Sequence, residues 1–145
     1  MLRSINIRSA LFVFSFSDLT SEIITDRSYQ DVYSDPGNFV SSKNEFGEYS
    51  LTINGNQLYL MGDGYSKEGQ FPFIDAYNIK TNKTKRLYQS PYTDKLENLY
   101  DAIDMKKGEI LVRIESKTEY PNYYVRNINK KNDLTAITTF ENPFK

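Results

Sequence analysis

Hydrophobic and polar residues alternate in short runs along most of the chain, and glycine, asparagine, aspartate or proline separates one run from the next. Residues 49–53, Tyr-Ser-Leu-Thr-Ile, are typical of these runs. Alternation with period two places every second side chain on the same face, so each run predicts a β-strand with one buried face. Many such strands, separated by turn residues, predict an all-β fold.

A pattern of four strands occurs twice and recurs after about 50 residues, a spacing that fits the blades of a β-propeller. A glycine-rich or asparagine-rich turn separates most neighbouring strands in both copies. Each copy therefore has the size of one four-stranded antiparallel blade. The predicted strands are 49–53, 58–61, 73–77 and 85–88 in the first copy, and 99–103, 110–113, 123–126 and 136–138 in the second.

The repeats predict a partial β-propeller of about two and a half four-stranded antiparallel blades over residues 1–145. A propeller normally closes with four or more blades, so we expect a fragment with open blade edges, which favour self-association. Its expected parts are a half blade at 11–24, an irregular connection at 26–46 with a short helical turn near 29–32, blades at 47–90 and 96–140, and an exit at 141–145.

The start of the chain has a second interpretation. Arg3 and Arg8 precede the apolar run 10–14, an arrangement also found in signal peptides. No cleavage site of small residues follows this run, so the sequence favours a strand. No run is long enough for a membrane helix, and we expect no membrane span.

Composition excludes several functions. The 18 Lys and Arg nearly balance the 19 Asp and Glu, and both signs are scattered, so nucleic acid is not an expected partner. The chain has neither histidine nor cysteine, which excludes a Ser-His-Asp triad, the commonest zinc ligand and thiolate chemistry. We therefore expect no catalysis by this chain alone.

Motifs for bound groups are incomplete as well. Gly64 to Gly69 contains Ser66, but the second glycine comes one residue too late for G-x-S-x-G. The pairs Glu115 with Glu119 and Asp101 with Asp104 lack a full set of calcium ligands. We expect no metal and no cofactor.

One segment concentrates candidate binding residues. Residues 115–124 combine acids with rigid aromatic surface, which is typical of substrate or domain contacts. The competing interpretation is structural: Pro121 fixes a turn, the two adjacent tyrosines pack on opposite faces of a strand, and the arginine before the segment pairs with a glutamate. The candidate substrate-facing or interdomain residues are Arg113, Glu115, Glu119, Tyr120, Asn122, Tyr123 and Tyr124.

Several motifs, in order, resemble the prolyl oligopeptidase family of serine peptidases, in the branch that includes glutamyl endopeptidases. In that family a propeller caps an α/β-hydrolase domain that carries the catalytic serine, aspartate and histidine. The resemblance extends from about Ser9 to the C-terminus, and 115–124 is its most specific part. The other motifs are 27–37, 59–69 followed by 72–75, 80–84 and 134–144.

The resemblance implies a non-catalytic propeller segment that gates access of peptides and docks the hydrolase domain of a parent serine peptidase. Its partners would be that domain, further blades of the parent chain and the parent's peptide substrate. It also implies an extracytoplasmic location, periplasmic or secreted. The alternative function is a free-standing β-rich module without enzymatic activity, which binds a peptide or glycan through exposed tyrosines.

Overall fold

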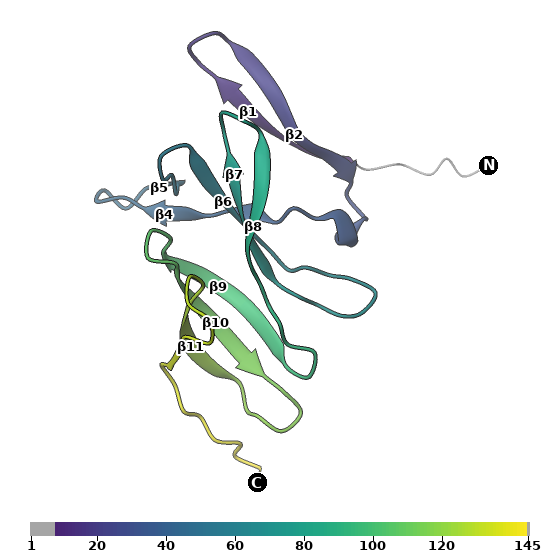
Figure 1. The fold of residues 1–145 in the computed structure, drawn as a ribbon, viewed down its shortest axis with the longest axis vertical. Helices are drawn as coiled ribbons and strands as arrows, with labels where there is room; N and C mark the ends of the chain where they lie inside the picture. Colours follow the sequence, from purple (N-terminus) through teal and green to yellow (C-terminus); the bar gives the residue numbers. More distant parts are fainter. Residues whose placement is uncertain (1–7, 145) are drawn as a thin grey trace, which may run out of the picture. The chain divides into compact units, whose positions relative to one another are not determined.

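The computed structural model describes residues 8–144, which form twelve β-strands and one short 3-10 helix (Figure 1). The prediction of an all-β fold is confirmed. The chain divides into two compact units, residues 1–36 and residues 37–145. Arg3, part of the alternative interpretation of the N-terminus, lies outside the described residues.

The first unit is a β-hairpin followed by a helical turn. β1 (Arg8–Ser15) pairs antiparallel with β2 (Thr20–Ser28), so the two strands predicted within 11–24 are confirmed, and both are longer than predicted. The carboxylate of Asp31 accepts hydrogen bonds from the Tyr33 and Ser34 N–H groups and caps η1 (Val32–Ser34). The helical turn expected near 29–32 therefore lies slightly later.

The second unit contains two four-stranded antiparallel sheets in which most strands pair with their sequence neighbours. The order is β3-β6-β7-β8 in the first sheet and β12-β11-β10-β9 in the second. No sheet within residues 8–144 closes on itself. The strands are β3 (Asn38–Phe39), β6 (Gln57–Gly62), β7 (Phe73–Asn78), β8 (Lys83–Gln89), β9 (Leu96–Asp104), β10 (Glu109–Glu115), β11 (Asn122–Asn127) and β12 (Leu134–Ala136).

One predicted pairing is wrong. Residues 49–53 were expected to form the first strand of the first blade, but β5 (Tyr49–Leu51) pairs with β4 (Ser41–Lys43) in a separate hairpin. The first strand of the four-stranded sheet is β3, inside the stretch expected to be irregular. The side chain of Asn44 explains the hairpin, because its oxygen accepts the N–H groups of Phe46 and Glu48 and closes a tight turn.

Val40 joins the hairpin to the sheet. Its N–H donates to the Tyr59 carbonyl of β6, and its own carbonyl accepts the Thr52 N–H, both at 2.9 Å. Residues 38–43 therefore form one nearly continuous extended segment, which pairs first with β6 and then with β5. Val40 is also buried.

The hydrophobic core lies between the two four-stranded sheets. On β10, buried residues alternate with partly exposed ones, which is the pattern of a strand with one face in a core. Burying one such aliphatic side chain contributes about 1.5–3 kcal/mol, so this contact is a major source of stability. The central core residues are Tyr59, Ile74 and Ala76 from the first sheet and Ile110, Val112 and Ile114 from the second.

A buried ion pair accompanies this core. Arg126 Nε lies 2.7 Å from Glu97 Oε1, and both side chains are almost fully buried. The Tyr88 hydroxyl donates to the other oxygen of Glu97 at 2.6 Å, and Arg126 donates to the Tyr92 hydroxyl at 3.0 Å. The network therefore joins β8, β9 and β11 with the connection between the two sheets.

The network also shifts proton affinities. Burial raises the pKa of Tyr88, and the hydrogen bond to Glu97 and its negative charge raise it further. For Arg126 burial lowers the pKa, but the charge of Glu97 and the contacts with Tyr88 and Tyr92 outweigh this effect, so the pKa is raised. Tyr88 therefore stays neutral and Arg126 stays charged.

No helix within residues 8–144 has both the length and the apolar character needed to cross a bilayer.

Candidate functional site

The seven candidate residues lie on or beside the second sheet, but they do not form one site. Glu119, Tyr120, Asn122 and Tyr124 line a common cleft. The other three residues, Arg113, Glu115 and Tyr123, are not part of its lining.

Arg113, Glu115 and Tyr123 make contacts within the sheet. The Arg113 guanidinium donates two hydrogen bonds to the Glu115 carboxylate, at 2.8 and 3.1 Å. Tyr123 packs edge-to-face on Tyr100, with ring centroids 5.5 Å apart, and hydrogen bonding between these tyrosines raises the pKa of Tyr123. The predicted pairing of Arg113 with a glutamate is thus present.

The cleft lined by the other candidates has a volume of about 380 Å³, within the range of roughly 300–1,000 Å³ that small-molecule pockets span. We call it the exit cleft, because the segment that follows β12 forms one of its walls. Glu119 lies at this cleft and accepts a hydrogen bond from the Lys95 ammonium at 2.6 Å, which raises the pKa of Lys95. The lining residues are Thr118, Glu119, Tyr120, Asn122, Tyr124, Phe140, Glu141 and Asn142.

The side chain of Asn122 organises the exit cleft. Its oxygen accepts the Phe140 N–H at 2.6 Å and the Thr138 hydroxyl at 2.9 Å. Its NH₂ group donates to the carbonyls of Phe140 and Tyr120 at 3.0 and 3.1 Å. An asparagine amide offers two donors and one oxygen with two lone pairs, so Asn122 is fully occupied and acts as a structural residue.

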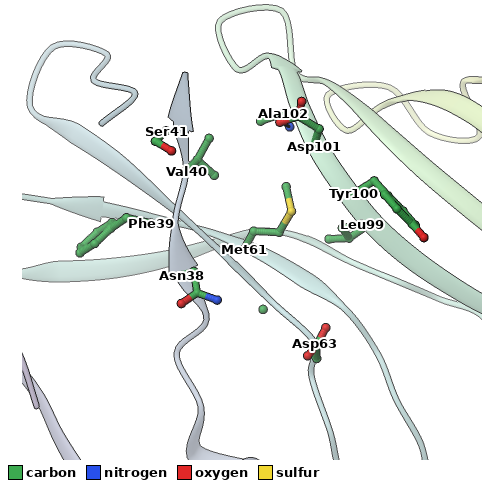
Figure 2. A pocket seen from close by; sticks show the side chains of 11 residues that line it. Asn38, Phe39, Val40, Ser41, Met61, Asp63, Leu99, Tyr100, Asp101 and Ala102 are labelled. Atoms are coloured by element: carbon green, nitrogen blue, oxygen red, sulfur yellow. Dashed lines mark hydrogen bonds between the residues drawn. The ribbon is translucent and has the colours of Figure 1, made fainter. Parts of the chain in front are cut away.

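A second cleft lies between the two four-stranded sheets, where β3 and the end of β6 face β9. We call it the inter-sheet cleft; its volume is about 280 Å³. Figure 2 shows Met61 between the residues of β3 and those of β9, while the rings of Phe39 and Tyr100 point away from the opening. Its carboxylates are those of Asp63 and Asp101, and the chain has no histidine to act with them.

The glycine-rich loop that carries Ser66 is held by its own contacts. The Ser66 hydroxyl donates to the Gly69 carbonyl at 3.0 Å and thus belongs to its own loop. Gly64 in this loop has φ +63°, and an added Cβ would lie 1.9 Å from the Phe71 carbonyl oxygen, so only glycine fits there. Residues 8–144 contain no group of three or more acidic side chains placed to hold a metal ion.

Four lining residues of the exit cleft were not among the predicted site residues: Thr118, Phe140, Glu141 and Asn142. Lys95, which pairs with Glu119 at this cleft, was not predicted either. The Asn-x-Tyr alternation in 122–124 does place Asn122 and Tyr124 on one face, but the sequence contains no signal that residue 140 returns to residue 122.

Comparisons with known proteins identify two similar plant proteins. Each is a probable chloroplastic glutamyl endopeptidase: the one from Oryza sativa subsp. japonica is 33% identical over 140 residues, and the one from Arabidopsis thaliana is 30% identical over 142 residues. The match covers 88% of this chain and 15% of either relative. The chain is therefore homologous to a small part of these peptidases. No family model and no solved structure matches it.

Proposed function

We propose that the chain is a non-catalytic propeller segment of a serine peptidase of the prolyl oligopeptidase family, which gates the access of peptides and docks the hydrolase domain. The similarity to two plant glutamyl endopeptidases over 88% of the chain carries this proposal. Peptide hydrolysis would belong to the intact parent protein, because the residues for a serine-histidine pair are missing here.

The two four-stranded sheets support the proposal. Propeller blades are four-stranded antiparallel meanders that bury their faces against each other. The β3-β6-β7-β8 sheet and the β12-β11-β10-β9 sheet have the same order outward from their first strands, and they share one core. In the proposed propeller they would be neighbouring blades, with β3 and β9 nearest the central axis and with the inter-sheet cleft beside it.

The end of the second sheet would provide the docking surface. β12 leads into residues 137–144, which lie beside β11 and the loop 116–121. Phe140 and Tyr120 are both exposed there. An exposed aromatic pair at the point where the chain leaves a blade favours contact with the domain that follows.

The test is to sequence the messenger RNA on both sides of the codons for Met1 and Lys145. We expect further blade repeats before this segment and a G-x-S-x-G motif, an aspartate and a histidine after it. The intact product should react with a fluorophosphonate probe for serine hydrolases, whereas the 145-residue chain should not. Stop codons immediately before and after this segment would contradict the proposal and support a free-standing binding module.

A further inference from the structure

The exit cleft combines aromatic walls with negative charge. Its lining includes three aromatic residues, Tyr120, Tyr124 and Phe140, and two acidic residues, Glu119 and Glu141. Aromatic faces carry partial negative charge and attract cations, and nearby carboxylates add to this attraction. The cleft therefore has the chemistry of a receptor for a positively charged side chain.

The walls of the cleft are held in place before any ligand binds. Tyr124 packs against the hydrophobic core, and the backbones of Tyr120 and Phe140 are both hydrogen-bonded to the side chain of Asn122. A site that is already ordered loses less conformational entropy on binding. Asn122 is fully occupied in this role, so it positions the walls and leaves the contacts with a ligand to the rings and acids.

The negative charge of the cleft is not fully neutralised. Glu119 is paired through Oε1 with Lys95, which shows that this carboxylate attracts a cation, and its side chain remains half exposed. Within residues 8–144 no ion pair involves Glu141, which is exposed. The same chain also stacks arginine on aromatic rings elsewhere: Arg86 lies 4.0 Å from the centroid of Phe73.

We propose that the exit cleft receives an arginine side chain of a docking polypeptide. Arginine fits better than lysine because its planar guanidinium stacks on aromatic faces and still donates hydrogen bonds to a carboxylate in its plane. The proposal rests on the proposed docking function only for the choice of a polypeptide as the partner. The choice of an arginine side chain rests on the volume of the cleft, its aromatic residues and its negative charge.

The test is a titration of the ¹⁵N-labelled 145-residue chain with N-acetylarginine methylamide, followed by NMR. N-acetylcitrulline methylamide has nearly the same shape without the charge and serves as the matched ligand. We expect saturable shifts of the Phe140 backbone amide and the Asn122 side-chain amide, with about tenfold weaker binding of citrulline, because a cation–π contact and an exposed ion pair each contribute a few-fold. Equal binding of both compounds, or no saturable shift, would overturn the proposal.

Variants locate the site. Tyr120→Leu and Phe140→Leu keep apolar bulk but remove a ring, and each should weaken arginine binding about threefold. Tyr65→Leu changes an exposed tyrosine that does not line the cleft and should leave the affinity unchanged. If Tyr65→Leu weakens binding as much as the cleft variants, arginine binds non-specifically and the proposal is wrong.

The titration uses the chain by itself, whereas the proposed propeller function is tested by the coding sequence and the serine probe. A failure of arginine binding therefore leaves the function proposal standing. Stop codons on both sides of this segment would likewise remove the hydrolase domain as the partner but would not change the outcome of the titration.

Discussion

The side-chain amide of Asn122 pairs with both backbone groups of Phe140: the Phe140 N–H donates to Oδ1 at 2.6 Å, and Nδ2 donates to the Phe140 carbonyl at 3.0 Å. Two such bonds are what a residue of a neighbouring antiparallel strand would supply. β12 ends at Ala136; the N–H groups of Ile137 and Thr138 still donate to the Tyr123 carbonyl, and from Phe140 the side chain of Asn122 takes over this pairing. The Thr138 hydroxyl adds to this by accepting the Tyr123 N–H at 2.9 Å.

Asn122→Ala should release the segment after β12 and leave the sheet intact. We expect the Phe140 amide to exchange with solvent at least about tenfold faster, and the free energy of unfolding to fall by about 1–2 kcal/mol because several hydrogen bonds are lost. Hydrogen exchange measured by NMR gives the exchange rate of the Phe140 amide and, from the slowest amides, the free energy of unfolding. Asn127→Ala, at the other end of β11, is the matched control and should not change exchange at Phe140. Unchanged protection of Phe140 in Asn122→Ala would contradict this role.

Removing one charge of the buried ion pair should lower the free energy of unfolding more than replacing both residues with apolar ones. Glu97→Gln leaves Arg126 buried without its counter-charge, so we expect the free energy of unfolding to fall by about 3–5 kcal/mol. The double variant Glu97→Leu with Arg126→Met removes both charges and should recover most of that loss. Urea unfolding of wild type, the single variants Glu97→Leu and Arg126→Met, and the double variant gives the coupling energy. A double variant as unstable as the sum of the single variants would show that the pair is not coupled.

Tyr88 should make stability depend on alkaline pH. Its pKa in the folded chain is raised above the ordinary value of 10.0, so above pH 10 the unfolded chain loses this proton while the folded chain keeps it. The stabilisation is complete below pH 10 and is lost as pH rises further. Urea unfolding at pH 9, 10 and 11 should show a steeper loss of stability for wild type than for Tyr88→Phe. Parallel curves would refute the raised pKa. Tyr29→Phe, at an exposed position, controls for the loss of a phenol.

Two glycines that both have positive φ should respond differently to substitution by alanine. Gly47 has φ +80° with nothing within 4 Å of an added Cβ, whereas at Gly64 the Cβ would collide with the Phe71 carbonyl. We expect Gly47→Ala to lower the free energy of unfolding by about 1 kcal/mol, the penalty of the left-handed conformation. Gly64→Ala should lower it by about 3 kcal/mol or more, because the loop must also move. Thermal unfolding compares the two, and equal losses would mean that the loop adapts freely.

The strand positions could be predicted from the sequence, but their partners could not all be predicted. Alternation identified β6, β7, β10 and β11 to within two residues at each end. β10 shows the expected single buried face, whereas five consecutive residues of β7 are buried, so both faces of that strand are covered. Alternation also identified Tyr49 to Leu51 as a strand. Alternation shows which way side chains point, but it does not say which strand lies beside them, so the pairing of β5 with β4 was missed.

The candidate site was partly predictable for a related reason. The acids and aromatics of 115–124 made this segment a candidate, and four of the seven candidate residues do share a cleft. Arg113 pairs with Tyr123 across β10 and β11. Side chains alternate along a strand, so Arg113 and Tyr123 lie on the other face of the sheet from Asn122 and Tyr124. The contact between Asn122 and Phe140 joins residues 18 positions apart, and Glu97 with Arg126 are 29 apart; such contacts depend on the completed fold.

The hairpin that follows Val40 should tolerate insertions and deletions. The hydrogen bond from the Thr52 N–H to the Val40 carbonyl closes the base of the β4–β5 hairpin, and the two strands beyond it, Ser41–Lys43 and Tyr49–Leu51, pair only with each other as a two-stranded sheet. Adding or removing residue pairs at its tip would leave the register of the four-stranded sheet unchanged. The hairpin is therefore the natural insertion point of this fold, where a loop or a tag can be accommodated without disturbing the hydrophobic core.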